Sequence, residues 1–180
     1  KLYLRIVDYK TGKKSFDLAE LRYGLGIQML LYLLALQKEG KAYFGEEIVP
    51  AGVLYTPSQT PILRTERGID EQTLKKEMQK TLRRSGLLLS EPEVLCAMEH
   101  SALEAPNYLP LQVKKEGELV GNLASAQQLG KLALYVEKLV REIAREMNEG
   151  NVSADPWTRG ADDNACRFCD YAAACHFEEG

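Results

Sequence analysis

The stretch KLYLRIVDYK constrains the fold of this chain more than any other part of it. Apolar residues recur at every second position over residues 2–9, which is the period of a β-strand with two unlike faces. The same period places Asp8 and Lys10 on one face at the end of the strand, while Tyr9 points to the other face. The sequence therefore predicts a strand that carries an acid and a base to its end, where the turn TGKK follows.

A helix is predicted over residues 18–37, directly after this turn. Asp17 offers an N-cap, and Glu20 three residues later is its capping-box partner. The second half of the helix, GLGIQMLLYLLAL, is so apolar that we expect it to be buried nearly all round. Gly40 is expected to end it.

Two polar residues interrupt this apolar helix. Gln28 and Tyr32 lie one turn apart on one face, and Gly24 lies one turn earlier on the same face. Because glycine costs about 1 kcal/mol against alanine inside a helix, we expect a close approach there. A buried amide and phenol require partners, which the strand end with Asp8 and Lys10 is placed to supply. The alternative is a satisfied polar pair in the core.

The remaining elements alternate in type. We expect a strand over 51–56 bounded by prolines, a charged helix from Asp70 to Gly86, a short helix capped by residues 90–93, a hairpin of 108–114 with 118–121, and a long helix from Ser125 to about Asn148. This order favours an α/β (α+β) layer fold with a small mixed sheet flanked by helices.

The charge and hydropathy of the sequence argue against a protein that is basic overall and against one that spans a membrane. The 180 residues carry a formal net charge of −3, so a site for a polyanion must be a local basic patch. No run of about 18 uncharged apolar residues is present to span a membrane. One helix face offers a basic patch, made of Lys75, Lys76, Lys80, Arg83 and Arg84. It either contacts DNA phosphates or, with the interleaved Glu71 and Glu77, forms a solvated face.

The spacing of Asp8 and Lys10 suits metal-assisted phosphodiester hydrolysis. The carboxylate ligates Mg²⁺, and the lysine orients the attacking water or neutralises charge in the transition state. The alternative is a solvated ion pair, worth less than about 1 kcal/mol.

The motif CRFCDYAAAC crowds three of the four cysteines into the tail of the chain. Cys166, Cys169 and Cys175 have the spacing C-x2-C-x5-C, which lets three thiolates share one metal centre in a reducing compartment. A zinc ion would require a fourth ligand, for which His176, His100 and Cys96 are the candidates.

The strand DYK, the turn TGKK and the helical QxxxY together resemble the RecB-like branch of the PD-(D/E)xK nucleases. The stretch KLYLRIVDYKTGKKSFDLAELRYGLGIQMLLYL is similar to AddB-type nuclease domains, and the similarity returns at the cysteine tail. The resemblance implies a PD-(D/E)xK restriction-endonuclease-like core that lacks its first elements. Residues 1–150 would form a partial nuclease domain, and residues 151–180 a linker and iron–sulfur tail packed on the same domain.

The resemblance also implies roles for single residues. Asp8 and the carbonyl of Tyr9 would bind Mg²⁺. Lys10 would activate water and stabilise the transition state, and Gln28 and Tyr32 would position Lys10 or a phosphate.

The resemblance favours iron over zinc in the tail. Cys166, Cys169 and Cys175 match the three downstream ligands of a [4Fe–4S] cluster. Cys96 does not match the upstream ligand and is expected to be a buried small hydrophobic residue. The fourth cysteine and the second metal-binding acid are expected upstream of Lys1, in a longer protein.

The function implied by the resemblance is a Mg²⁺-dependent DNA exonuclease domain of an ATP-dependent helicase–nuclease. It would process double-strand break ends for homologous recombination in the bacterial cytoplasm, with DNA and an AddA-type helicase–nuclease subunit as partners and without a membrane. One alternative is a Cas4-like iron–sulfur nuclease. The long insert between Gln37 and Ser125 disfavours this alternative, because Cas4-like chains are more compact. The other is a non-catalytic DNA-end-binding module that keeps the fold and cluster for structure alone.

Overall fold

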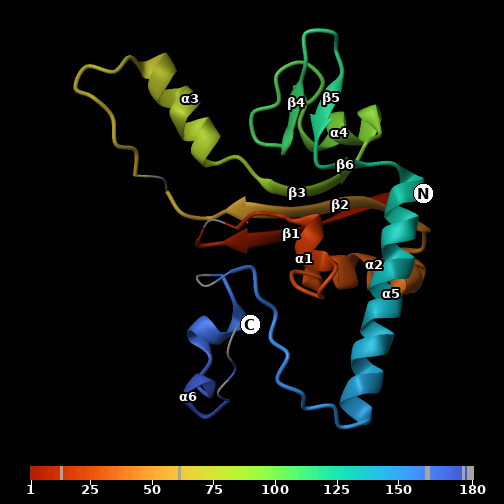
Figure 1. Cartoon of the computed structure of the whole chain (residues 1–180). Helices are drawn as coiled ribbons and strands as arrows, with labels where there is room; N and C mark the ends of the chain where they lie inside the picture. Colours follow the sequence, from red (N-terminus) through yellow and green to blue (C-terminus); the bar gives the residue numbers. More distant parts are fainter. Residues whose placement is uncertain (13, 61, 161–162, 176, 178–180) are drawn as a thin grey trace. The chain divides into compact units, whose positions relative to one another are not determined.

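The computed structural model describes residues 1–12, 14–60, 62–160, 163–175 and 177. Its centre is a mixed sheet with the strand order β1-β2-β3-β6 (Figure 1). These strands are β1 (Leu2–Lys10), β2 (Ile48–Pro57), β3 (Ser85–Leu89) and β6 (Leu123–Ala124). β1 pairs with β2 in parallel, β2 with β3 in antiparallel and β3 with β6 in parallel orientation. The prediction of a small mixed sheet flanked by helices is confirmed.

The predicted helix over 18–37 is two helices, α1 (Leu18–Leu21) and α2 (Gln28–Phe44). Gly24 and Gly26 lie between them with φ angles of +81° and +69°, a left-handed conformation that favours glycine. The expectation that Gly24 lies on a helix face is therefore wrong, because this glycine lies in the turn between α1 and α2. Asp17 does cap α1, since its carboxylate accepts a hydrogen bond from the Ala19 amide.

Burial of α2 is limited to one face, so the expectation that it is buried nearly all round is wrong. Met29, Leu30 and Leu33 are buried, whereas Gln28 and Tyr32 are exposed. The reason is that α2 packs against β1 and β2 with one side only, because it lies on one face of the sheet (Figure 1).

Gly40 does not end α2, contrary to expectation. The helix continues to Phe44, and Gly45, with a φ of +74°, forms its left-handed C-cap. Gly40 is instead a packing position, because a Cβ atom there would lie 2.5 Å from Cγ1 of Ile48, the first residue of β2.

The charged helix is α3 (Glu71–Thr81), capped by Asp70 as predicted. It ends well before Gly86, which lies inside β3, a strand that the sequence pattern did not indicate. Gly86 is needed there because a Cβ atom would collide with the carbonyl of Val53 on β2.

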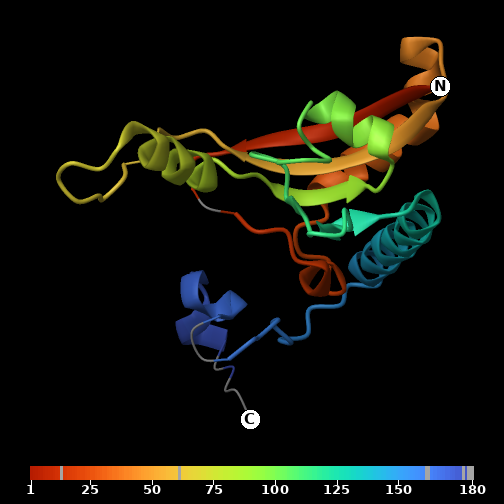
Figure 2. The same ribbon diagram turned by 90° about the horizontal axis from the view of Figure 1, so that it is seen from above.

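The other face of the sheet is covered by α4 (Pro92–Met98) and by the hairpin of β4 (Leu111–Val113) and β5 (Leu119–Gly121), as Figures 1 and 2 show. The short helix and the hairpin were both predicted. The buried cluster on this side consists of Leu54, Leu88, Leu95, Ala102, Leu109 and Leu111.

The chain divides into two compact units, Lys1–Glu137 and Lys138–Gly180. The long helix α5 (Ala126–Asn148) belongs to both, and a reciprocal capping box of Ser125 and Gln128 starts it, as predicted. The second unit also contains the 3₁₀ helix η1 (Ala165–Phe168) and the short helix α6 (Ala172–Cys175). Within the described residues, no helix has the length and apolar character that a membrane span requires.

Candidate active site

Asp8 and Lys10 lie at the carboxyl end of β1, on the face that α2 covers. The Lys10 ammonium is 2.8 Å from the Asp8 carboxylate. Both line a cavity of about 460 Å³ together with Gln28 and Tyr32 from the first turn and a half of α2. The structure therefore brings the four side chains predicted for the site to one place.

The two polar residues of α2 form a pair of their own. The Gln28 side-chain amide donates a hydrogen bond of 2.7 Å to the Tyr32 hydroxyl. The pair is exposed, with Tyr32 52% exposed, so the expectation of a buried amide and phenol is wrong. An exposed pair at the wall of a cavity remains able to contact a ligand.

Tyr55 is a residue of this site that the sequence did not reveal. It lies beside Asp8 in the parallel register of β1 and β2, and the Lys10 ammonium is 5.8 Å from the centre of its ring. At this distance a cation is attracted by the face of an aromatic ring. Burial raises the pKa of the Tyr55 hydroxyl above its ordinary value, so the phenol is neutral when it faces Lys10.

The charge of Lys10 is stabilised by its neighbours. The hydrogen bond with Asp8 is the largest influence and raises the pKa of the Lys10 ammonium, although desolvation opposes it. Lys10 therefore offers a positive charge and hydrogen-bond donors at neutral pH, and it is not a proton acceptor there.

The oxygen atoms at this end of β1 can supply part of the ligand shell of a hard cation such as Mg²⁺. The carbonyl of Lys10 accepts a hydrogen bond from the Ser58 amide beside β2. Because successive carbonyls of a strand point to opposite sides, the Tyr9 carbonyl points to the open edge of the sheet. Asp8 and this carbonyl fit two positions of a Mg²⁺ shell. Among the described residues, no three His, Cys, Asp or Glu side chains gather as a metal site.

The three cysteines of the tail line a second cavity, of about 270 Å³, in the unit Lys138–Gly180. Cys169 and Cys175 are exposed and Cys166 is partly exposed, and none forms a disulfide. Although they line a common cavity, the three thiols do not form a metal-holding group in the described part of the chain, so the shared metal centre stays a prediction. Cys96 lies on α4 of the unit Lys1–Glu137 and is partly exposed, so the expectation that it is buried is wrong, and His100 lies in the turn after that helix. His176 is outside the described residues.

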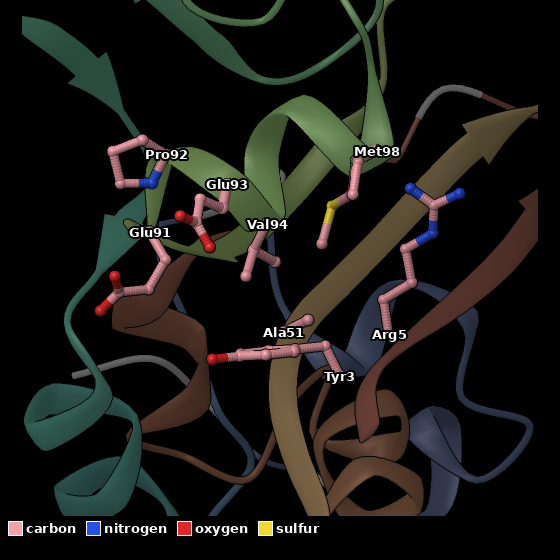
Figure 3. Close-up of a pocket in the computed structure, with 9 residues that line it drawn as sticks. Tyr3, Arg5, Ala51, Glu91, Pro92, Glu93, Val94 and Met98 are labelled. Carbon is pink, nitrogen blue, oxygen red and sulfur yellow. The ribbon is translucent and has the colours of Figure 1, made fainter. Parts of the chain in front are cut away.

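A third cavity lies on the opposite face of the sheet. It measures about 570 Å³ and lies between β1, β2 and α4, and it is lined by Tyr3, Arg5 and Met98 among others (Figure 3). Asp8, Lys10, Gln28 and Tyr32 are not among its lining residues, so these four side chains belong to the face that α2 covers.

Comparison with known proteins agrees with this geometry. A sequence model described as the PD-(D/E)XK nuclease superfamily matches residues 1–176. The chain is 36% identical, over 98% of its length, to the B-type subunit of the ATP-dependent helicase/deoxyribonuclease of Acetivibrio thermocellus. The corresponding proteins of Clostridium tetani and Thermoanaerobacter sp. are 36% and 33% identical over the same share. The chain spans about 15% of the length of each relative. The resemblance to AddB-type proteins is thereby confirmed, and the chain belongs to the PD-(D/E)XK nuclease superfamily.

Proposed function

We propose that this chain is the Mg²⁺-dependent DNA exonuclease module of an AddB-type helicase–nuclease subunit. The observation that carries the proposal is the cavity that gathers Asp8, Lys10, Gln28 and Tyr32. The names of the relatives support a helicase and deoxyribonuclease context. In that context the parent protein would work with an AddA-type subunit on double-strand break ends for homologous recombination in the bacterial cytoplasm.

The roles of the residues follow from their chemistry. Asp8 and the Tyr9 carbonyl would hold Mg²⁺, which polarises a phosphodiester and its attacking water. When Mg²⁺ and substrate bind, the Lys10 ammonium would break its ion pair with Asp8 and donate a hydrogen bond to the phosphate or to the attacking water. Its positive charge would stabilise the negative charge of the phosphorane-like transition state. The Gln28–Tyr32 pair would orient Lys10 or a phosphate oxygen.

The tail would hold an iron–sulfur centre. Cys166, Cys169 and Cys175 would supply three thiolates of a [4Fe–4S] cluster, whose fourth ligand comes from elsewhere in the parent protein. The centre would be structural, because phosphodiester hydrolysis has no redox step.

The test is the Lys10→Ala variant of the intact subunit, in complex with a partner whose own nuclease is disabled. We expect Mg²⁺-dependent cleavage to fall by about a hundredfold or more, which is the usual loss for one transition-state contact. Folding and DNA binding should remain. Lys41→Ala, which removes an exposed lysine from the last turn of α2, is the matched control. Cleavage by Lys10→Ala at the control's rate would refute the assignment.

A further inference from the structure

A large cavity lies on the other side of Lys10 from the active-site cavity. It measures about 830 Å³ and is enclosed by three segments of the unit Lys1–Glu137. The first segment comprises residues 10–12, 14 and 15, at the end of β1 and after it. The second comprises residues 55–57, 59, 60 and 62, at the end of β2 and after it. The third comprises residues 80, 81 and 83–85, from the end of α3 to β3. Lys10 lines both cavities, so the two hollows adjoin at the reacting end of β1.

The described residues that line this cavity have one sign of charge. They include Lys10, Lys14, Lys80, Arg83 and Arg84, and no Asp or Glu. The chain as a whole has a net charge of −3, so the positive charge is concentrated locally against the overall balance. A cavity lined by one sign of charge focuses the field and attracts the opposite charge.

Arg83 is held in place by uncharged groups, whereas the three lysines of the cavity are paired with carboxylates at the surface. Arg83 donates hydrogen bonds to the carbonyls of Leu109 and Leu111, which fix its guanidinium but carry no formal charge. Lys14 is 3.9 Å from Glu20, and the exposed Lys80 is paired with Glu77. Such surface pairs are worth about 1 kcal/mol or less, so a phosphate can replace the carboxylate.

Arg84 places a positive charge close enough to Arg5 on β1 to influence its pKa. Burial lowers the pKa of Arg5 on β1, and the charge of Arg84 lowers it further. The two guanidiniums therefore repel each other, and an anion bound to Arg84 in the basic cavity would weaken this repulsion. Thr56, which also lines the cavity, has a buried hydroxyl without a hydrogen-bond partner in the described part of the chain.

We propose that this basic cavity binds the phosphates of single-stranded DNA next to the bond that is cut. The proposal rests on the proposed nuclease function and adds the substrate class and its path. A cavity whose described lining contains cations but no acidic side chain favours a polyanion. The hydroxyl groups of Ser15, Thr60 and Thr81, which also line the cavity, are suited to hydrogen bonds with phosphate oxygens. A volume of about 830 Å³ is that of a small-ligand site, which accommodates a few nucleotides of one strand.

The first test replaces two cavity cations in the intact helicase–nuclease complex, as Lys14→Gln with Arg84→Gln. The matched control is Lys75→Gln with Lys76→Gln, which removes the same charge from α3 outside the cavity. Cleavage of an oligothymidylate is followed without ATP over a range of salt concentrations. We expect KM to rise by about tenfold with kcat nearly unchanged, and the slope of log(kcat/KM) against log salt to flatten by about 1.4, which is 0.7 for each of two phosphate contacts.

The second test needs no cleavage and separates the two proposals. An oligonucleotide of photoreactive 4-thiothymidine is crosslinked to the Lys10→Ala complex, and the adducts are mapped by mass spectrometry. We expect adducts within residues 55–60 and 80–85. If none appears there, or if the cavity variant keeps the control's KM and salt slope, the basic cavity is not the strand path, even though Lys10→Ala is inactive. If Lys10→Ala cleaves normally while the adducts appear, the catalytic assignment fails and the strand path stands.

Discussion

At the scale of single residues, Asp8 and Lys10 form one ion pair whose two members would have separate tasks in the proposed reaction. Each neutralises the other at 2.8 Å, and each would be released when a cation binds Asp8 and a phosphate binds Lys10. The period of a strand suffices to predict that they share a face. The same reasoning could not reveal Tyr55, because its place beside Asp8 depends on the register between β1 and β2, which is a tertiary property.

Glu99 is another residue whose role appears only in the structure. Its carboxylate accepts hydrogen bonds from the backbone amides of Asn107 at 2.5 Å, Leu109 at 3.0 Å and Tyr108 at 3.2 Å. Burial raises the pKa of this carboxyl, but the three amides together outweigh it, so the pKa is lowered. One side chain thus organises the loop between α4 and β4.

We predict that Glu99→Gln loosens this loop, by about 1–2 kcal/mol for lost charge-assisted hydrogen bonds. Because the folded-state pKa is lowered, the stabilisation is fully present above the unfolded value of 4.5 and is lost as the pH falls through the folded value. Hydrogen exchange of residues 99–110, compared with wild type at each pH, measures the effect. Glu93→Gln on α4 is the control, and equal exchange in all three proteins at pH 7 would contradict the prediction.

At the scale of elements, the sequence predicted the helix starts, because contacts between neighbouring residues determine where a helix begins. The caps Asp17, Asp70 and Ser125 are all found, because a cap is a contact between near neighbours. The break between α1 and α2 was missed, since its glycines continue an apolar pattern that looks helical. β3 was missed because it is short and Gly86 within it looks like a terminator, whereas the close approach of Val53 requires that glycine.

The packing of α2 on β2 gives a prediction at this scale. Gly40→Ala should lower the free energy of unfolding by about 1 kcal/mol, because overpacking against Ile48 costs about 1–3 kcal/mol and helix propensity returns about 1 kcal/mol. Gly130→Ala in α5 meets no atom within 4 Å and should raise stability by about 1 kcal/mol. Urea unfolding of the purified chain measures both. A stabilised Gly40→Ala variant would show that Ile48 yields without cost.

At the scale of the whole molecule, the division at Glu137 and Lys138 separates two kinds of chemistry. The cavity with Asp8 and Lys10 and the basic cavity belong to the first unit, and the cysteine cavity belongs to the second. The short spacers predicted that the three cysteines lie near one another, and they do line one cavity, but the metal centre that they would share stays a prediction. The position of the tail on the nuclease domain stays a prediction.

The tail provides the prediction at this scale. The intact protein purified without oxygen should be brown and contain about four irons per chain, as a [4Fe–4S] centre requires. Cys169→Ser should lose the colour and the iron, whereas Cys96→Ser, on α4 outside the cysteine cavity, should keep both. Absorption spectra and metal analysis decide. A colourless protein with one zinc would contradict the iron assignment and keep the shared site.

β1 lies at the edge of the described sheet, so its backbone amides report whether another strand pairs with that edge. Every second amide and carbonyl of β1 points away from β2, at a spacing that any extended peptide can match. No proline interrupts residues 2–10 to prevent such pairing. The outward amides therefore exchange quickly with solvent while the edge is bare and slowly once a neighbouring strand covers it. Their exchange rates distinguish a covered edge from a bare one without an activity assay.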